Sequence, residues 1–253
     1  MKSKRINQIE EYVLNKNTVT LDTLTDVFNV SKNTIRRDIQ ELVKRGNIKK
    51  VYGGVAANSK LLVPFNERQI KNSYAKSLIA KTASNFVKDG DIIFIDSGTT
   101  TLNMGEFLKD KNNLTIITNN LNFIINCIKY NNLNIISTGG TLNRKTNSFA
   151  GIDSLNLLKN YNINKAFMAA TGVSLTNGIT NSSPLESEIK RTAVRKSSEV
   201  FILADYSKFD ICSLVTYCNL DDIDYLITNN LPPEEYVELI EKNSVELIVA
   251  DQI

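Results

Sequence analysis

The chain has 253 residues, including 30 Lys and Arg, 27 Asp and Glu, three Cys and no His. This length predicts one large domain or two unequal ones, and a composition of 42% hydrophobic and 23% charged residues is typical of globular proteins. Without His there is no imidazole base, no Ser-His-Asp triad and no His metal ligand, and three Cys at these spacings form no zinc site. No apolar run approaches the roughly 18 residues of a membrane span, so we expect a cytoplasmic protein without a membrane partner, metal or cofactor.

Charge is unevenly distributed along the chain. Residues 1–60, called the head, contain 12 Lys and Arg and 6 Asp and Glu, a net charge of +6. Residues 61–253, called the body, carry a net charge of −3. A basic head on a mildly acidic body predicts an anionic partner for the head alone, and nucleic acid is the leading candidate.

The first 45 or so residues predict three short helices. Apolar residues recur at helical spacing over residues 6–14, 21–28 and 35–43. Ser31 is a suitable N-cap for the third helix and Gly46 a suitable end. Because residues 28–31 leave room only for a tight turn, this spacing predicts a helix-turn-helix.

The third predicted helix has a polar face opposite its apolar stripe. Asn33, Arg36 and Arg37 project together with Gln40 at this spacing. Arg reads guanine, and Asn and Gln read adenine, when a recognition helix enters the major groove. A merely solvated face is the alternative, which the turn and the net charge of the head disfavour. The predicted DNA-binding residues of this segment are Ser31, Lys32, Asn33, Thr34, Arg36, Arg37 and Gln40.

Residues 48–55 predict a short hairpin, or wing. Its Lys49, Lys50 and Tyr52 are candidates for phosphate contacts beside the groove. The alternative is a hairpin that closes the domain and touches no DNA.

The segment Val30-Ser31-x-x-Thr34-Ile35-Arg36-Arg37-Asp38-Ile39, followed by Gly46 and Tyr52-Gly53-Gly54, resembles the N-terminal signature of DeoR-family bacterial transcription regulators. The family usually has His where Tyr52 stands. The resemblance implies a winged helix-turn-helix that binds double-stranded operator DNA. We place this domain at residues 1–57, a linker at 58–74 and a second domain at 75–253; the linker includes Pro64-Phe65-x-x-Arg68, which is similar to the family's entry into its second domain.

The body predicts an α/β domain. Helices are expected over residues 75–87 and 121–127, and buried strands over residues 91–96, 116–118, 135–137, 166–169, 200–204, 225–228 and 245–249. Short apolar runs separated by helical stretches predict βαβ units and a mostly parallel sheet.

Polar residues and glycines follow these strands, at the edge where such sheets bind ligands. After the first strand, Gly98 would let the backbone approach an anion, and the neighbouring amides and hydroxyls would donate to it. Lys208 would supply a cation and Glu186 a carboxylate for sugar hydroxyls; a polar turn, a solvated Lys and a surface Glu186–Lys190 ion pair are the respective alternatives. The predicted ligand-binding residues are Asp96, Ser97, Gly98, Thr99, Thr100, Thr101, Asn119, Gly139, Gly140, Arg144, Thr171, Gly172, Glu186, Asp205 and Lys208.

The body also resembles the DeoR-family effector domain, in the strings Asp96-Ser-Gly-Thr-Thr-Thr101, Gly139-Gly140-Thr-Leu142 and Asp205-x-Ser207-Lys208-Phe209. The resemblance implies a sugar-phosphate sensor with the fold of ribose-5-phosphate isomerase. The implied function is repression of a sugar-metabolism operon, with operator affinity controlled by a phosphorylated sugar. Because one head has a small footprint, we expect a homo-oligomer, a dimer or tetramer, on a repeated or palindromic site.

Two other functions remain open from the sequence. One is a sugar-phosphate isomerase with a basic DNA-binding appendage, although residues 171–174, at the nearest comparable strand end, contain no acid to act as a base. The other is an architectural DNA-binding protein with an inert body. Stabilisation of the protein by a sugar phosphate would distinguish a sensor from the architectural protein.

Overall fold

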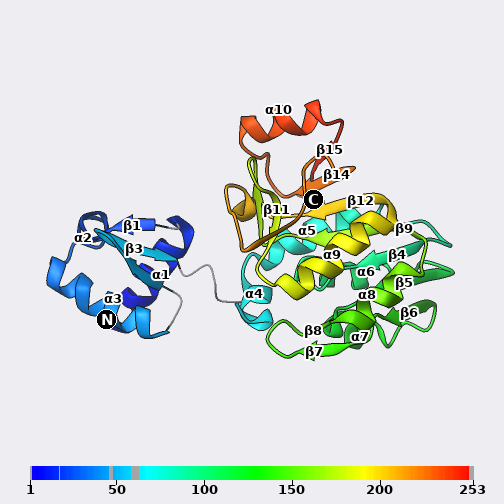
Figure 1. Ribbon diagram of the computed structural model, residues 1–253, viewed down its shortest axis with the longest axis horizontal. Coiled ribbons are helices and arrows are strands. Elements are labelled where there is room, and N and C mark those ends of the chain that lie inside the picture. The colour runs from blue at the N-terminus through cyan, green and yellow to red at the C-terminus, as the bar shows by residue number, and fades with distance from the viewer. Residues whose placement is uncertain (1, 17, 46–47, 58–62, 251–253) are drawn as a thin grey trace. The chain divides into compact units, whose positions relative to one another are not determined.

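The computed structural model describes residues 2–16, 18–45, 48–57 and 63–250, and its chain forms two compact units, Met1–Leu61 and Leu62–Ile253 (Figure 1). The first unit contains the head and the second contains the body. The predicted end of the third helix at Gly46 lies outside the described residues.

The head is a winged helix-turn-helix. Its elements are α1 (Lys2–Lys16), β1 (Thr18–Thr20), α2 (Leu21–Phe28), α3 (Lys32–Arg45), β2 (Ile48–Val51) and β3 (Gly54–Ala57), and its three strands form an antiparallel sheet in the order β1-β3-β2. The three predicted helices and the predicted hairpin are confirmed. The strand β1 was not predicted, because three residues are too few to show an alternating pattern.

Local capping explains where the helices of the head begin. Thr20 accepts a hydrogen bond from the backbone N–H of Thr23 at 3.1 Å and so caps α2. Ser31 accepts one from the backbone N–H of Thr34 at 3.3 Å, which confirms Ser31 as the cap of α3. Between the two helices, Asn29 adopts the left-handed conformation with φ 48° and turns the chain. The helices bury one core with the sheet, made of Ile6, Ile9, Val13, Val19, Leu24, Ile35, Ile39, Leu42, Ile48 and Val55.

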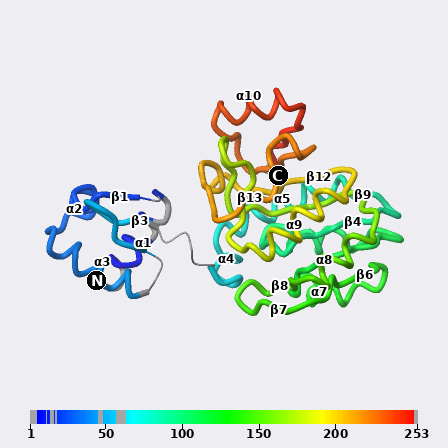
Figure 2. Tube along the Cα trace, viewed as in Figure 1, coloured from blue at the N-terminus to red at the C-terminus, as the bar shows by residue number. Residues whose placement is uncertain are grey.

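The centre of the body is a seven-stranded sheet in the order β15-β14-β12-β9-β4-β5-β6 (Figures 1 and 2). Every neighbouring pair in it is parallel. All seven strands lie where the sequence predicts them: β4 (Ile92–Ile95), β5 (Leu114–Thr118), β6 (Leu133–Ser137), β9 (Ile163–Ala169), β12 (Ser197–Leu203), β14 (Tyr225–Thr228) and β15 (Glu246–Val249). The chain runs outward from β4 in one direction through β5 and β6 and then returns to β9 on its other side, so the strand order reverses between β4 and β9.

Helices cover both faces of this sheet and produce two separate hydrophobic cores. One core includes residues of α5 (Ser73–Ser84), α6 (Met104–Phe107) and α7 (Leu121–Cys127); the other includes residues of α8 (Ile152–Lys159), α9 (Pro184–Lys196) and α10 (Glu234–Lys242). Successive residues of a strand enter opposite cores, as Phe94 and Ile95 do. Burial on both faces explains why the strands are continuous apolar runs.

Smaller elements surround the carboxyl edge of the sheet. They are the helix α4 (Phe65–Ile70), the hairpin of β7 (Thr141–Asn143) and β8 (Ser148–Ala150), the antiparallel sheet of β10 (Gly172–Ser174), β11 (Gly178–Asn181) and β13 (Val215–Cys218), and the 3-10 helices η1 (Thr101–Asn103) and η2 (Tyr206–Lys208). The helix α4 falls inside the stretch 58–74 that the sequence assigned to a linker. Phe65 is buried in a core of the body, so this part of the expected linker is folded structure. Within the described residues, no helix combines the length and apolar character needed to cross a membrane.

Candidate functional site

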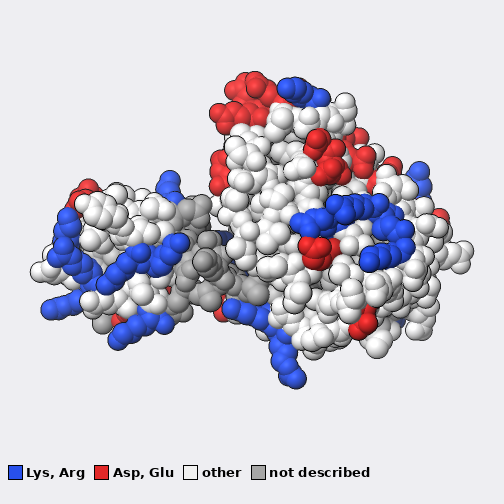
Figure 3. All heavy atoms as spheres, viewed as in Figure 1, with Lys and Arg blue, Asp and Glu red and all other residues white. Residues whose placement is uncertain are grey.

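The exposed side of α3 carries the predicted DNA-binding residues of the helix. Lys32, Asn33, Arg36, Arg37 and Gln40 are exposed, whereas Ile35, Ile39 and Leu42 on the opposite side are buried. Figure 3 shows Lys and Arg side chains distributed over the visible face of the head. Ser31 and Thr34 differ from the rest, because their hydroxyls are hydrogen-bonded to each other at 2.9 Å, beside the capping hydrogen bond that starts the helix.

The wing extends the same surface. Lys49 and Lys50 are exposed on β2, and Tyr52 is fully exposed in the turn that follows. A groove of about 260 Å³ lies between α3 and the wing, and its lining includes Arg36, Gln40 and Lys50. The structure therefore brings side chains of the helix and of the wing to one hollow of the head.

A partly buried ion pair joins α3 to α1. Asp38 is 1% exposed and accepts two hydrogen bonds from the guanidinium of Arg5, at 2.7 Å from Nε and 3.3 Å from an Nη. The hydrogen bond to Asp38 raises the pKa of Arg5 above its usual value. Sequence reasoning gave Asp38 no role, although its position next to Ile39 and one turn after Ile35 places it on the buried side of the helix. It positions the recognition helix rather than facing outward.

In the body, a pocket lies at the carboxyl ends of β4, β9 and β12, on both sides of the point where the strand order reverses. Open α/β sheets bind their ligands at such a point. The strand-end residues that line it are Gly98, Thr99, Thr100, Ala169, Ala170, Thr171, Asp205 and Lys208. Six of these, all but Ala169 and Ala170, are among the predicted ligand-binding residues.

The loop after β4 presents backbone to this pocket. Among the described residues, the N–H groups of Gly98, Thr99 and Thr100 donate no backbone hydrogen bond outside the helices and strands. Thr101, in contrast, donates its hydroxyl to the carbonyls of Asp96 at 2.7 Å and Gly98 at 3.0 Å, so it holds the loop instead of facing a ligand. Gly98 is required for packing, because a Cβ there would lie 2.1 Å from the Cβ of Ala169.

A buried ion pair lies beneath the pocket. One of its members, Asp96, was predicted from the sequence to bind the ligand. The carboxylate of Asp96 accepts hydrogen bonds from the ammonium of Lys190 and from the N–H of Ala169 at 3.1 Å. Lys190 also donates to the carbonyl of Ala169 at 2.9 Å. The side chains of Asp96 and Lys190 are 0% and 3% exposed. Asp96 therefore joins the ends of β4 and β9 to α9, and Ser97 lies beside it with its hydroxyl 3.5 Å from the same carboxyl group.

The alternative prediction of a surface ion pair between Glu186 and Lys190 is wrong. Glu186 is buried and accepts hydrogen bonds from the hydroxyl of Ser148 and from the amide of Asn181, the latter at 3.4 Å. Its carboxylate does not line the pocket. Thr171, which does, donates to Asn181 at 3.1 Å, so Glu186 is linked to the pocket wall through this amide.

Several cations that sequence reasoning missed complete the pocket. Arg68, Lys71 and Lys76 line it together with Lys208. Burial lowers the pKa of Arg68 and of Lys208. Burial, followed by the charge of Lys208, lowers the pKa of Lys76 to about 8. The signal was present as Pro64-Phe65-x-x-Arg68, but broken periodicity led to this stretch being interpreted as a linker.

Asp205 is the acidic member of the pocket. Burial would raise its pKa, but the charge of Lys208 and hydrogen bonds from Ser207 and Asn72 outweigh it, and the pKa lies below its usual value. Asn72 donates to Asp205 Oδ1 at 2.9 Å. The other oxygen, Oδ2, is buried and has no hydrogen-bond partner among the described residues. It is an acceptor available for a hydroxyl donor.

The remaining predicted ligand residues do not reach this pocket. The amide of Asn119 donates to the carbonyl of Phe149 at 3.3 Å, and Arg144 is an exposed side chain of the β7–β8 hairpin loop. Gly140 and Gly172 are needed for close packing, because a Cβ would lie 2.6 Å from the hydroxyl of Ser154 and 2.2 Å from the carbonyl of Ile211, respectively. Gly139, with φ 64°, shapes the turn before β7.

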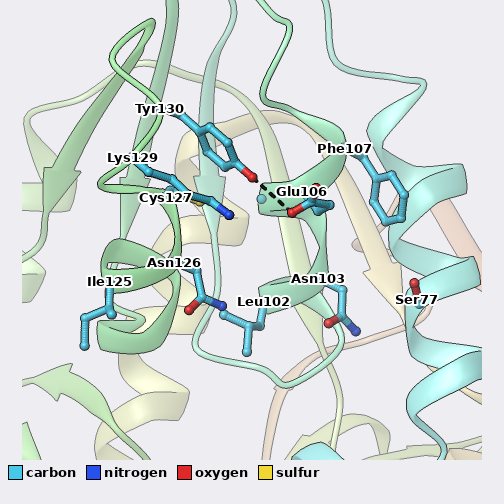
Figure 4. A pocket seen from close by; sticks show the side chains of 11 residues that line it. Ser77, Leu102, Asn103, Glu106, Phe107, Ile125, Asn126, Cys127, Lys129 and Tyr130 are labelled. Carbon is cyan, nitrogen blue, oxygen red and sulfur yellow. Dashed lines mark hydrogen bonds between the residues drawn. The ribbon is translucent and has the colours of Figure 1, made fainter.

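A larger pocket of about 600 Å³ lies elsewhere, between α5, α6 and α7 (Figure 4). Tyr130 donates to Glu106 there at 3.0 Å, and Lys129 extends toward the same group in Figure 4. Its lining contains one acidic residue, Glu106, and one basic residue, Lys129, so the opposite charges cancel. The smaller pocket at the strand ends, with four cations and one acid, is therefore the better match to an anion.

Comparison with known proteins gives the family. Residues 5–61 match the DeoR-like helix-turn-helix domain, and residues 71–230 match the DeoR C terminal sensor domain. The HTH-type transcriptional regulator IolR of Bacillus subtilis is 46% identical over 251 residues, which cover 99% of this chain and 100% of that protein. The HTH-type transcriptional regulator GolR of Listeria innocua is 32% identical and covers 90% of each chain, and the HTH-type transcriptional repressor GlcR of B. subtilis is 28% identical, covering 98% of this chain and 96% of its own.

Among solved structures, ribose 5-phosphate isomerase from Plasmodium falciparum aligns with 55% of this chain and 52% of its own, at 14% identity and a TM-score of 0.39. That likeness is too low to indicate a shared activity. The relatives above are named as transcriptional regulators or repressors, so the interpretation as a regulator holds over the isomerase alternative. The chain belongs to the DeoR family of helix-turn-helix transcriptional regulators.

Proposed function

We propose that this regulator represses a sugar-metabolism operon and that a phosphorylated sugar, bound in the pocket at the strand ends, controls its affinity for operator DNA. The observation that carries the proposal is the set of four cations, Arg68, Lys71, Lys76 and Lys208, around the loop after β4. A phosphate dianion bonded to such cations forms charge-assisted hydrogen bonds, which are about twice as strong as neutral ones.

The chemistry of the pocket distinguishes two ends of the ligand. The cations and the backbone N–H groups of residues 98–100 favour a phosphate. Asp205, with its unpartnered Oδ2, favours a sugar hydroxyl, and the hydroxyls of Thr99, Thr100 and Thr171 add further donors and acceptors. In this proposal Gly98, Thr101 and Asp96 shape the site, and Asn119, Arg144 and Glu186 make no ligand contact.

The head would dock α3 in the major groove. Arg36, Arg37, Asn33 and Gln40 would reach base edges, and Lys49, Lys50 and Tyr52 on the wing would contact the backbone of the DNA. Because a single head covers few base pairs, the proposal includes at least a dimer on a palindromic or repeated site. Sedimentation of the protein with and without operator DNA measures this; a strict monomer on DNA would contradict it.

The decisive experiment is fluorescence anisotropy on DNA from upstream of the gene itself and of the adjoining genes. Phosphorylated pentoses and hexoses are titrated into the complex, with the free sugars as controls. Tight, salt-sensitive binding that one phosphorylated sugar weakens, and its free form does not, is the expected result. Tight binding that no compound changes would overturn the sensing half of the proposal and leave the DNA-binding half intact.

A further inference from the structure

We propose that the strap, defined as α4 with residues 71–72, changes its conformational freedom when ligand enters the pocket and thereby carries the effect of the ligand toward the head. This inference rests on the proposed function, since it concerns how occupancy of that same pocket regulates operator binding. Four observations on the strap support it.

The first is its place in the chain. The strap is the first helix described after the head and directly precedes α5. It nevertheless supplies Arg68, Lys71 and Asn72 to the lining of the pocket. A ligand that touches these side chains therefore touches the segment of the body nearest to the head in sequence.

The second is the way its carboxyl-terminal end is held. The buried ammonium of Lys76 on α5 donates to the carbonyls of Arg68 and Lys71, the latter at 2.6 Å. Asn72 adopts the left-handed conformation with φ 55°, and its amide donates to Asp205 at 2.9 Å. Both groups that hold this end, Lys76 and Asp205, also line the pocket, so ligand contacts and strap contacts use the same side chains.

The third is the way the other end is held, which depends on the core of the body and on one pocket residue, Arg68, whose Nε donates to the carbonyl of Val63 at 3.1 Å. Phe65 is buried in a core of the body, and its N–H donates to the carbonyl of Lys145 at 2.9 Å. Pro64 precedes the helix without a side-chain cap. The end that begins at Phe65 is thus anchored mainly in the core, whereas the end at Asn72 is held by pocket residues and is the one on which a ligand acts most directly.

The fourth is electrostatic. The positive charges of Lys208, Arg68 and Lys71 each lower the pKa of Lys76, so these like charges oppose one another while no anion is bound. A phosphate dianion among them removes this repulsion and forms bonds to side chains of the strap. Ligand then binds the ordered strap better than the loose one, which is the differential affinity that a ligand-driven shift requires.

A fluorescence experiment tests the proposal, because the chain has no Trp and a single introduced Trp gives the whole signal. Ile70→Trp places the reporter on the strap, and Ile128→Trp places it at the end of α7 as the control. The two side chains are matched in exposure, at 79% and 77%, and neither lines the pocket. The probes are inorganic phosphate, ribose 5-phosphate, glucose 6-phosphate and fructose 6-phosphate, and a rise in melting temperature identifies those that bind.

For a probe that binds, we expect iodide quenching of the Ile70→Trp reporter to fall about twofold and that of the Ile128→Trp control to stay unchanged. Equal responses of the two reporters, with binding and DNA release both observed, would overturn the role of the strap and leave the proposed function standing. If no phosphorylated probe stabilises the protein or releases operator DNA, the proposed function fails and this inference fails with it.

A second pair of variants tests transmission rather than movement. Pro64→Gly loosens the entry to the anchor, and Phe65→Leu weakens the anchor while keeping an apolar side chain in the core. Either variant should reduce the ligand-driven change in operator affinity about fivefold or more, since allosteric couplings in proteins typically span roughly 5–150-fold. Ligand-induced stabilisation and operator affinity without ligand should match the unmodified chain. Full ligand response in both variants would contradict the proposal.

Discussion

The two units of the protein carry their functional side chains in opposite ways. In the head, the residues proposed to read DNA lie on the exposed side of one helix and on a short wing, and Lys32 of that helix pairs with the exposed Asp22. In the body, half of the residues that line the pocket are buried, and the acidic side chains at and beneath it, Asp205 and Asp96, are bonded to other elements. The difference indicates that the head can change its contacts without cost to its fold, whereas the pocket is part of what holds the body together.

The largest expected effect tests this contrast in the body. Lys190→Met leaves the carboxylate of Asp96 buried without its partner, and breaking a buried pair in this way costs about 3–5 kcal/mol of unfolding free energy. Urea denaturation of the full chain measures the loss. Lys159→Met, at an exposed position of α8, is the control and should change stability little. Equal stability of the two variants would show that the buried pair does not support the fold.

A smaller effect is expected inside the pocket. Lys208→Met removes one charged donor and should weaken the affinity for a phosphorylated sugar by about 1.5–3 kcal/mol, with operator affinity in the absence of ligand unchanged. Titration calorimetry gives the affinity, and Lys88→Met, an exposed residue outside the pocket, is the control. An unchanged affinity would remove Lys208 from the site.

The matching change in the head should have the reverse pattern. Arg37→Ala is expected to weaken operator binding by about 1–3 kcal/mol if the side chain reads a base. Because Arg37 is exposed, its loss should not disturb the fold of the head. Stability and ligand affinity should be unaffected, and Lys159→Ala on the body serves as the control. Operator binding as tight as in the unmodified chain would show that α3 presents a different face to DNA.

The smallest expected effect depends on pH. The pKa of Lys76 is lowered to about 8, so this ammonium is charged below that pH and neutral above it. A bound phosphate favours the charged form, and since the second pKa of a phosphoryl group is about 6, only the protein titrates between pH 7 and 9. Ligand affinity should therefore fall by up to about tenfold over this range. Calorimetry at the two pH values measures it, and Lys76→Gln should flatten the dependence; a flat profile in the unmodified chain would contradict the assignment.

Much of the fold could be predicted from sequence because its signals are local. The seven parallel strands are buried on both faces and form continuous apolar runs in the sequence, and α7 has the predicted bounds. The six-residue α4 was missed, since its one buried anchor, Phe65, docks on residues far along the chain. The antiparallel strands β10, β11 and β13 were missed because each has only three or four residues, and β13 also pairs with a strand distant in sequence.

The candidate sites divide in the same way. The face of α3 follows from helical spacing alone, and the strand-end loops follow from the topology of a parallel sheet. Which polar residues face the ligand depends on partners distant in sequence: Asp96 is bonded to Lys190, and Thr101 to its own loop. Gly98 was predicted to let the backbone approach an anion, and the structure adds that at Gly98 and Gly172 two segments of the chain pack too closely for a Cβ.

The contact between Gly98 and Ala169 has an evolutionary consequence. Because a Cβ on residue 98 would lie 2.1 Å from the Cβ of Ala169, the two positions share space for one methyl group. Substitution at either position is constrained by the other: Gly98→Ala should be tolerated only together with Ala169→Gly. Homologues are therefore expected to keep at least one glycine in this pair, at either of the two positions. Residues 98 and 169 should covary among them, even where the ligand differs.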